Sequence, residues 1–115
     1  MTNIATKKLS KSGIVEASSS LVAEWAPANG ETVELIEFYP SGSVDLKGAA
    51  ILYWDYGGDN EIIWSSYSSA SFLGNVLENN SFAGDGAKKF AIVLRNYSLQ
   101  SAYLSGAANF RVITE

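Results

Sequence analysis

Hydrophobic and polar positions alternate with a period of two along many short stretches of this chain, each closed by glycine, asparagine or serine. Residues 88–96 show the pattern most clearly, with Phe90, Ile92 and Leu94 on one parity and the residues between them on the other. Successive side chains of a β-strand point to opposite faces, so this pattern predicts a strand with one face in a core. No stretch sustains the helical period of 3.6 residues.

The most apolar pair of expected strands surrounds the sequence Gly-Gly-Asp-Asn at residues 57–60. Aliphatic and aromatic residues fill both flanks, and glycine and asparagine supply the positive φ angles that a tight turn needs. We therefore expect a β-hairpin over residues 49–64. Because this hairpin holds two of the three tryptophans, we expect Trp54 and Trp64 to lie in the core.

A strand is also expected over residues 32–39, but its apolar residues change parity part-way along. Val33 and Leu35 lie on one parity, whereas Ile36 and Phe38 lie on the other. A β-bulge near Leu35 and Ile36, which inserts one extra residue into the strand, reconciles the two halves.

Shorter segments of similar composition complete the set of expected strands: residues 21–25, 44–46, 71–77, 102–105 and 107–113. Proline, glycine and serine between them predict a turn over residues 40–43 and a loop over residues 65–70. About eight short strands separated in this way predict an all-β antiparallel β-sandwich, with a jelly-roll topology favoured over an immunoglobulin-like one. The sandwich is expected over residues 21–115, and residues 1–20 form either an N-terminal arm or an edge strand.

Composition narrows the chemistry. The chain has no cysteine and no histidine, which removes disulfides, thiolate metal sites and histidine-based acid–base catalysis. Its net charge of −4 lacks the basic footprint of a nucleic-acid-binding protein, and no apolar run reaches the ~18 residues of a membrane helix. We expect no catalytic residues, no cofactor, no nucleic-acid partner and no membrane contact. No secretory signal is evident, so synthesis in the cytoplasm is expected.

Carboxylates near the predicted turns raise the question of a metal site. Oxygen ligands on loops assemble Ca²⁺ sites, and Asp55, Asp59 and Asp85 are the candidates for a Ca²⁺-dependent binder. Their spacing matches no calcium-binding loop, and aspartate is an ordinary turn former, so we expect no metal. Asp55 and Asp59 stay candidates for ligand or interface contacts.

Tyrosines at predicted turns support a second function. Tyr56, Tyr67 and Tyr97 are candidates for a platform that stacks on sugar rings or for anchors in an interface. The corresponding hypothesis is a carbohydrate- or receptor-binding module. The alternative for each aromatic residue is a place in the core.

Low charge favours association. Only 17% of the residues are charged, whereas a soluble monomer usually carries more, because mixed charges discourage association. We expect a surface that lies against copies of itself or another partner. The basic segment with Lys7, Lys8 and Lys11 belongs to an arm that either pairs with a neighbouring subunit or stays solvated.

Three motifs carry a resemblance to a known group of proteins. They are I-E-F at residues 36–38, W-D-Y-G-G at residues 54–58 and G-D-G-A-K-K at residues 84–89. Over residues 31–112 the chain resembles small β-sandwich proteins encoded among the structural genes of tailed bacteriophages, in which these motifs recur in this order. The resemblance implies a virion component, such as a capsid decoration, head–tail or tail accessory protein, and it transfers no functional residue.

The first hypothesis is therefore a non-enzymatic virion structural protein, made in the host cytoplasm. It would act by self-association or by docking on a larger assembly through exposed strand edges and the N-terminal arm. The expected partners are other virion proteins and the chain itself, as a homo-oligomer and foremost a trimer.

Overall fold

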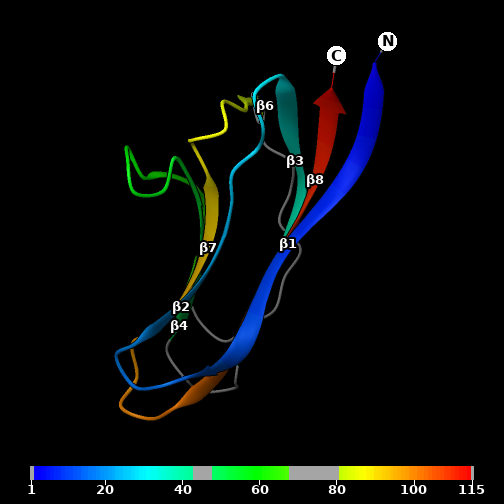
Figure 1. The fold of residues 1–115 in the computed structure, drawn as a ribbon. Coiled ribbons are helices and arrows are strands. Elements are labelled where there is room, and N and C mark those ends of the chain that lie inside the picture. Colours follow the sequence, from blue (N-terminus) through cyan, green and yellow to red (C-terminus); the bar gives the residue numbers. More distant parts are fainter. Residues whose placement is uncertain (1, 43–47, 68–80, 115) are drawn as a thin grey trace.

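The computed structural model describes residues 2–42, 48–67 and 81–114, which form eight antiparallel strands (Figure 1). No helix long and apolar enough to cross a membrane occurs among these residues. In chain order the strands are β1 (Asn3–Val15), β2 (Ser20–Trp25), β3 (Glu31–Gly42), β4 (Gly48–Trp54), β5 (Glu61–Tyr67), β6 (Ser81–Ala83), β7 (Phe90–Asn96) and β8 (Ala102–Thr114).

The strands form two four-stranded sheets that face each other in Figure 1, with orders β1-β8-β3-β6 and β2-β7-β4-β5. Each strand of the first half of the chain pairs with its counterpart in the second half: β1 with β8, β2 with β7, β3 with β6 and β4 with β5. This is the jelly roll, a long antiparallel ribbon that turns back at the β4–β5 hairpin and is then rolled up. The predicted fold class is confirmed.

The core lies between the sheets and is built from the parities that the sequence indicates. Phe90, Ile92 and Leu94 of β7 are fully buried against residues of β8. Phe90 lies at the centre of the aromatic residues of the core. The centroid of its ring is 4.5 Å from that of Trp54 and 4.6 Å from that of Phe110. The predicted core position of Trp54 is confirmed, whereas the side chain of Trp64 lies outside the described residues.

The predicted bulge in β3 is confirmed. Leu35 pairs with Phe110 and Glu37 pairs with Asn109, so Ile36 is the extra residue. This insertion lets Leu35 and Phe38 both enter the core, although their sequence separation is odd.

Two predicted boundaries are wrong. The turn expected over residues 40–43 starts too early, because β3 continues to Gly42 with Pro40 opposite Gly106. β6 pairs only with residues 32–34, so in the described part of the chain Pro40 lies on an edge-like stretch, where a missing N–H is tolerated.

The loop expected over residues 65–70 is likewise wrong at its start, since β5 continues to Tyr67. The strands expected over residues 44–46 and 71–77 lie outside the described residues.

Gly106 does not end a strand, as the sequence suggested, but lies within the continuous strand β8. A Cβ atom there would lie 3.1 Å from Ile92 Cγ2 and 3.2 Å from Leu94 Cδ2. Glycine therefore lets the two sheets approach closely, which is a role that a glycine in a strand often has.

One polar side chain, Asn96, is buried among the described residues. Its Nδ2 donates to the carbonyls of Val15 and Gln100 at 2.9 and 2.8 Å. Its Oδ1 accepts from the backbone N–H and the hydroxyl of Ser98 at 2.8 and 2.7 Å, and its own backbone N–H donates to the Ser19 carbonyl at 3.0 Å. Through its side-chain amide and its backbone N–H, Asn96 thus joins the end of β1 to the β1–β2 and β7–β8 connections.

We predict that Asn96→Ala destabilises the protein by about 3 kcal/mol, because it leaves several buried polar groups without partners. Asn109→Ala is the matched control, since the Asn109 side chain is half-buried and donates to Glu37 at 2.7 Å. The control should cost less than about 1 kcal/mol. Urea unfolding measures both values, and equal destabilisation would contradict the central role of Asn96.

Candidate functional site

The loop between β4 and β5 is closed by its own polar groups. The Asp55 carbonyl accepts from the N–H groups of Gly58 and Asn60 at 3.0 Å, and its carboxylate accepts from the Asp59 N–H at 3.1 Å. The expected positive φ angles occur at Gly57 (90°) and Asn60 (51°), and Asp55 also has one (56°). Asp55 therefore acts as a turn former, through bonds to the local backbone.

The position of the Asp55 carboxylate explains why residue 58 is a glycine. A Cβ atom on Gly58 would lie 2.6 Å from Asp55 Oδ1, so any side chain there would displace the acceptor. The loop is also joined to the connection between β6 and β7, because the Tyr56 N–H donates to the Lys89 carbonyl at 3.1 Å.

Asp85 has a similar role at the turn before β7. Its Oδ1 accepts from the backbone N–H groups of Lys88 and Ala87 at 2.7 and 2.8 Å. These two hydrogen bonds hold the pKa of the Asp85 carboxyl below its ordinary value. Across the described residues, no group of three or more carboxylates is placed to hold a metal ion. The structure thus offers no support for a calcium site built on Asp55, Asp59 and Asp85.

The candidate tyrosines do not form one platform. Tyr56 follows β4 at the end of the sandwich where β7 begins, since Trp54 pairs with Phe90. Tyr97 directly follows β7 and so lies at the opposite end, 49% exposed. Tyr56 is half-buried and packs on Tyr53 with ring centroids 5.3 Å apart. The side chain of Tyr67, in β5, lies outside the described residues.

The outer edge of β1, which pairs with no second strand in the described part of the chain, is the most extended candidate surface. β1 runs for 13 residues and pairs along its whole length with β8, and it ends the order of its sheet. Residues 3–15 of the expected arm or edge strand are therefore built into the sandwich. Ile4 and Ile14, near the two ends of the strand, are 66% and 70% exposed. Each has an apolar partner on β8, Ile113 and Tyr103 respectively.

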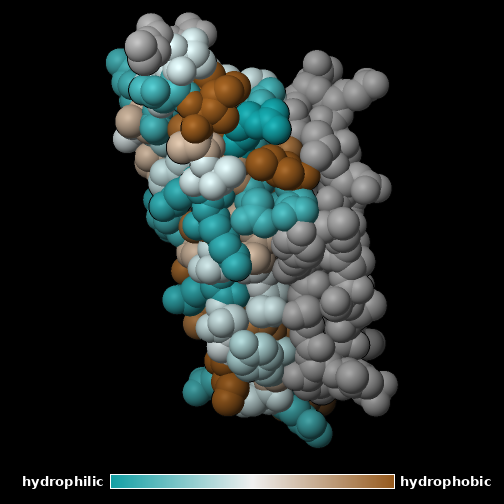
Figure 2. Space-filling view, turned by 90° about the vertical axis from the view of Figure 1, so that its right-hand side faces the viewer, coloured by the Kyte–Doolittle hydropathy of each residue, from teal (hydrophilic) through white to brown (hydrophobic). Residues whose placement is uncertain are grey.

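Figure 2 shows the side of the molecule on which β1 lies. In the coloured part of this view, brown, hydrophobic surface appears mainly toward the top and the bottom, and the surface between them is mostly teal or white. The polar middle of β1 contains Lys7, Lys8 and Lys11. Lys7 reaches across the opening between the sheets and places its Nζ 5.6 Å from the centre of the Trp25 ring, a cation–π contact.

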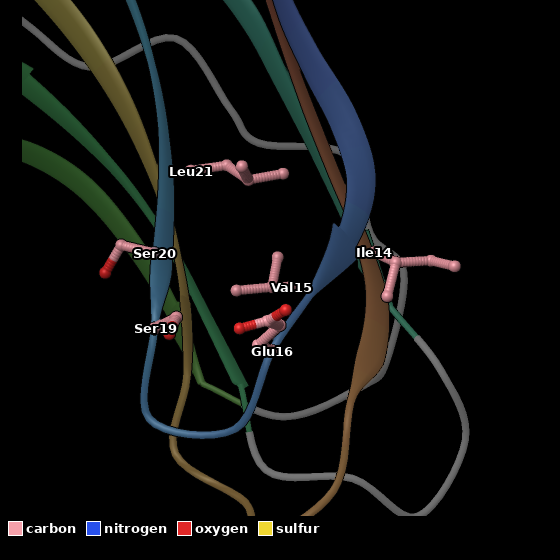
Figure 3. A pocket seen from close by; sticks show the side chains of 6 residues that line it. All are labelled: Ile14, Val15, Glu16, Ser19, Ser20 and Leu21. Atoms are coloured by element: carbon pink, nitrogen blue, oxygen red, sulfur yellow. The ribbon is translucent and has the colours of Figure 1, made fainter.

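A pocket of about 290 Å³ opens where β1 turns into β2 (Figure 3). Val15 and Leu21 point into the gap between the two strands, whereas Ile14 points away from it. The Ser19 hydroxyl donates to the Ala17 carbonyl and is not bonded to the nearby Glu16 carboxylate. Among the described residues, Ser19 therefore has no bond to a base that could activate it as a nucleophile.

Sequence reasoning missed two exposed apolar side chains near this end. Leu99, at the turn between β7 and β8, is 94% exposed, and Tyr103 is 52% exposed. The alternation of β8 places Tyr103 on its outer face. For Leu99, nothing in the neighbouring sequence shows whether a leucine in a turn is exposed to solvent or packs against the protein.

Comparison with known proteins gives the fold alone. No protein-family model matches the chain, and no curated protein matches it. Among solved structures, a mitogen derived from Yersinia pseudotuberculosis is similar with a TM-score of 0.52 and 17% identity, over 94% of this chain and 86% of that one. A Bacillus endospore appendage that forms disulfide-linked pili gives 0.49 and 10% identity, over 99% and 89% of the two chains. PirA gives 0.41 and 16% identity, over 91% of each.

We predict a pH-dependent role for Asp85 in stability. Because its pKa is lowered in the folded state, its contribution is present above the ordinary value of 3.8 and is lost as the pH falls through the folded-state value. Asp85→Ala should lower the melting temperature near pH 7, and the difference from the parent should shrink as the pH falls below 3.8. Thermal scans over this pH range check this, and a difference that stays constant down to the most acidic pH would contradict it.

Proposed function

We propose that this chain is a non-enzymatic structural subunit that associates with copies of itself through the free edge of β1. The observation that carries the proposal is the length of this edge. An edge strand presents unpaired N–H and C=O groups, and thirteen residues of β1 present one side to no neighbouring strand in the described part of the structure. Strand addition at such an edge gives main-chain hydrogen bonds to an incoming strand.

Exposed apolar side chains also support the β1 edge as the site of association. Ile4 and Ile14 expose about two-thirds of their area at the two ends of β1, and each sits beside a further apolar residue on β8. A strand added to β1 would cover part of this area, and buried apolar area stabilises association.

The setting that we propose is a virion, with a homo-oligomer, foremost a trimer, as the working form. Support comes from the resemblance of the motifs at residues 36–38, 54–58 and 84–89 to phage structural proteins, and from the low share of charged residues. The mitogen structure is similar in fold alone, and one fold is compatible with many functions.

Deletion of the N-terminal segment is a poor test of this proposal. Leu9 is buried in the core, and β1 covers β8 along its length. Removing residues 1–12 would open the core and expose a new edge on β8, so loss of stability would be confused with loss of association.

Proline substitution separates the two effects. In an antiparallel pair, backbone N–H groups alternate between pointing at the partner strand and pointing away. Of Ala5→Pro and Thr6→Pro, one removes a bond to β8 and lowers the melting temperature, and the other removes only an outward N–H.

We predict that the parent chain forms a concentration-dependent oligomer in light scattering behind a sizing column. The proline variant that keeps the higher melting temperature should be monomeric at the same concentrations. Leu99→Ser, at an exposed position in the turn between β7 and β8, is the control and should behave as the parent. A parent chain that is monomeric throughout, or an oligomer unaffected by the outward proline, would overturn the proposal.

A further inference from the structure

The β1 edge carries an uneven distribution of charge. Lys7, Lys8 and Lys11 give residues 1–15 a charge of +3 with no carboxylate. Since the whole chain has a net charge of −4, residues 16–115 carry −7. One edge of the subunit is therefore basic and the rest of it is acidic.

This distribution disfavours pairing of β1 with β1 of a second copy. In a two-fold antiparallel pair centred on Leu9, Lys7 of each copy lies opposite Lys11 of the other. Like charges directly opposite each other destabilise a strand pair, and lysines on an edge strand are a known protection against self-pairing. The partner of this edge should instead be an acidic strand.

The β4–β5 hairpin provides two carboxylates at the start of an outer strand. β5 ends the order of the second sheet and begins with Glu61, directly after the loop that contains Asp59. Asp59 and Glu61 are exposed, and neither side chain forms an ion pair with another described residue. Ile62 beside them is 56% exposed, which adds apolar area to the charge.

The two surfaces lie on different sides of the molecule. In Figure 1 the hairpin loop is drawn in green at the left, away from β1 at the right. Lys8 and Lys11, like the two carboxylates, form no ion pair within the described residues. Within the described part of the chain, these charges are thus not neutralised by an ion pair, and a copy that uses one surface leaves the other for a second neighbour.

We infer that the basic β1 edge of one subunit docks on the acidic β5 edge, around Asp59 and Glu61, of a second copy of this chain. This inference rests on the proposed self-association and names its contact. A contact between two different surfaces is heterologous, so repetition gives a ring where the rotation closes and a filament where it does not. The expected trimer is the smallest such ring.

Charge reversal tests the contact. Lys8→Glu with Lys11→Glu should abolish association in light scattering, and so should Asp59→Lys with Glu61→Lys. A chain with all four reversals restores opposite charges across the contact and should associate again. Raising the salt concentration should weaken association of the parent by tenfold or more, because exposed charges are screened. Melting temperatures show whether each variant is folded.

The outcomes separate this inference from the proposed function. If the outward proline in β1 abolishes association but both charge-reversed pairs still associate, β1 is the contact and its acidic partner is refuted. The same conclusion follows if the folded four-fold variant stays monomeric, or if association is insensitive to salt. Loss in each pair with recovery in the four-fold variant supports the inference.

Discussion

The structure depends on the buried amide of Asn96. At this end the chain crosses from one sheet to the other after β1 and again after β7, and these two crossings lie side by side because β1 pairs with β8 and β2 with β7. Asn96 bonds to the backbone on both crossings, at Val15 and Ser19 on one and at Ser98 and Gln100 on the other. Apolar packing between the sheets is non-directional, whereas these hydrogen bonds fix where each strand ends.

The strands and the core could be predicted because they follow from local patterns. Alternation identified the side of β7 that faces the other sheet, although Ala91 and Val93 on its second side are buried as well. The change of parity in β3 identified the bulge at Ile36. The wrong predictions concern residues whose structural role depends on residues far away in the sequence. Gly106 resembles a turn residue in sequence but allows close approach of the two sheets. Pro40 resembles a strand terminator but lies where the edge of β3 has no described partner.

The candidate site was harder to predict, because function here depends on which surfaces the roll leaves uncovered. Tyr56 and Tyr97 look equivalent in sequence, and only the topology puts them at opposite ends of β7. The motifs that carry the phage resemblance have structural roles: a bulge, a hairpin turn and the Asp85 turn. The lysines near the N-terminus can be assigned to a basic sheet edge only when it is known that residues 3–15 form an edge strand.

The central claim is that the outward side of β1 pairs with a neighbour. Hydrogen–deuterium exchange followed by mass spectrometry, at low and high protein concentration, tests it directly. The outward N–H groups of residues 3–15 should exchange more slowly as concentration rises, together with those of residues 58–63, while residues 97–101 stay unchanged. Exchange in β1 that is the same at all concentrations, or protection confined to residues 97–101, would contradict the claim.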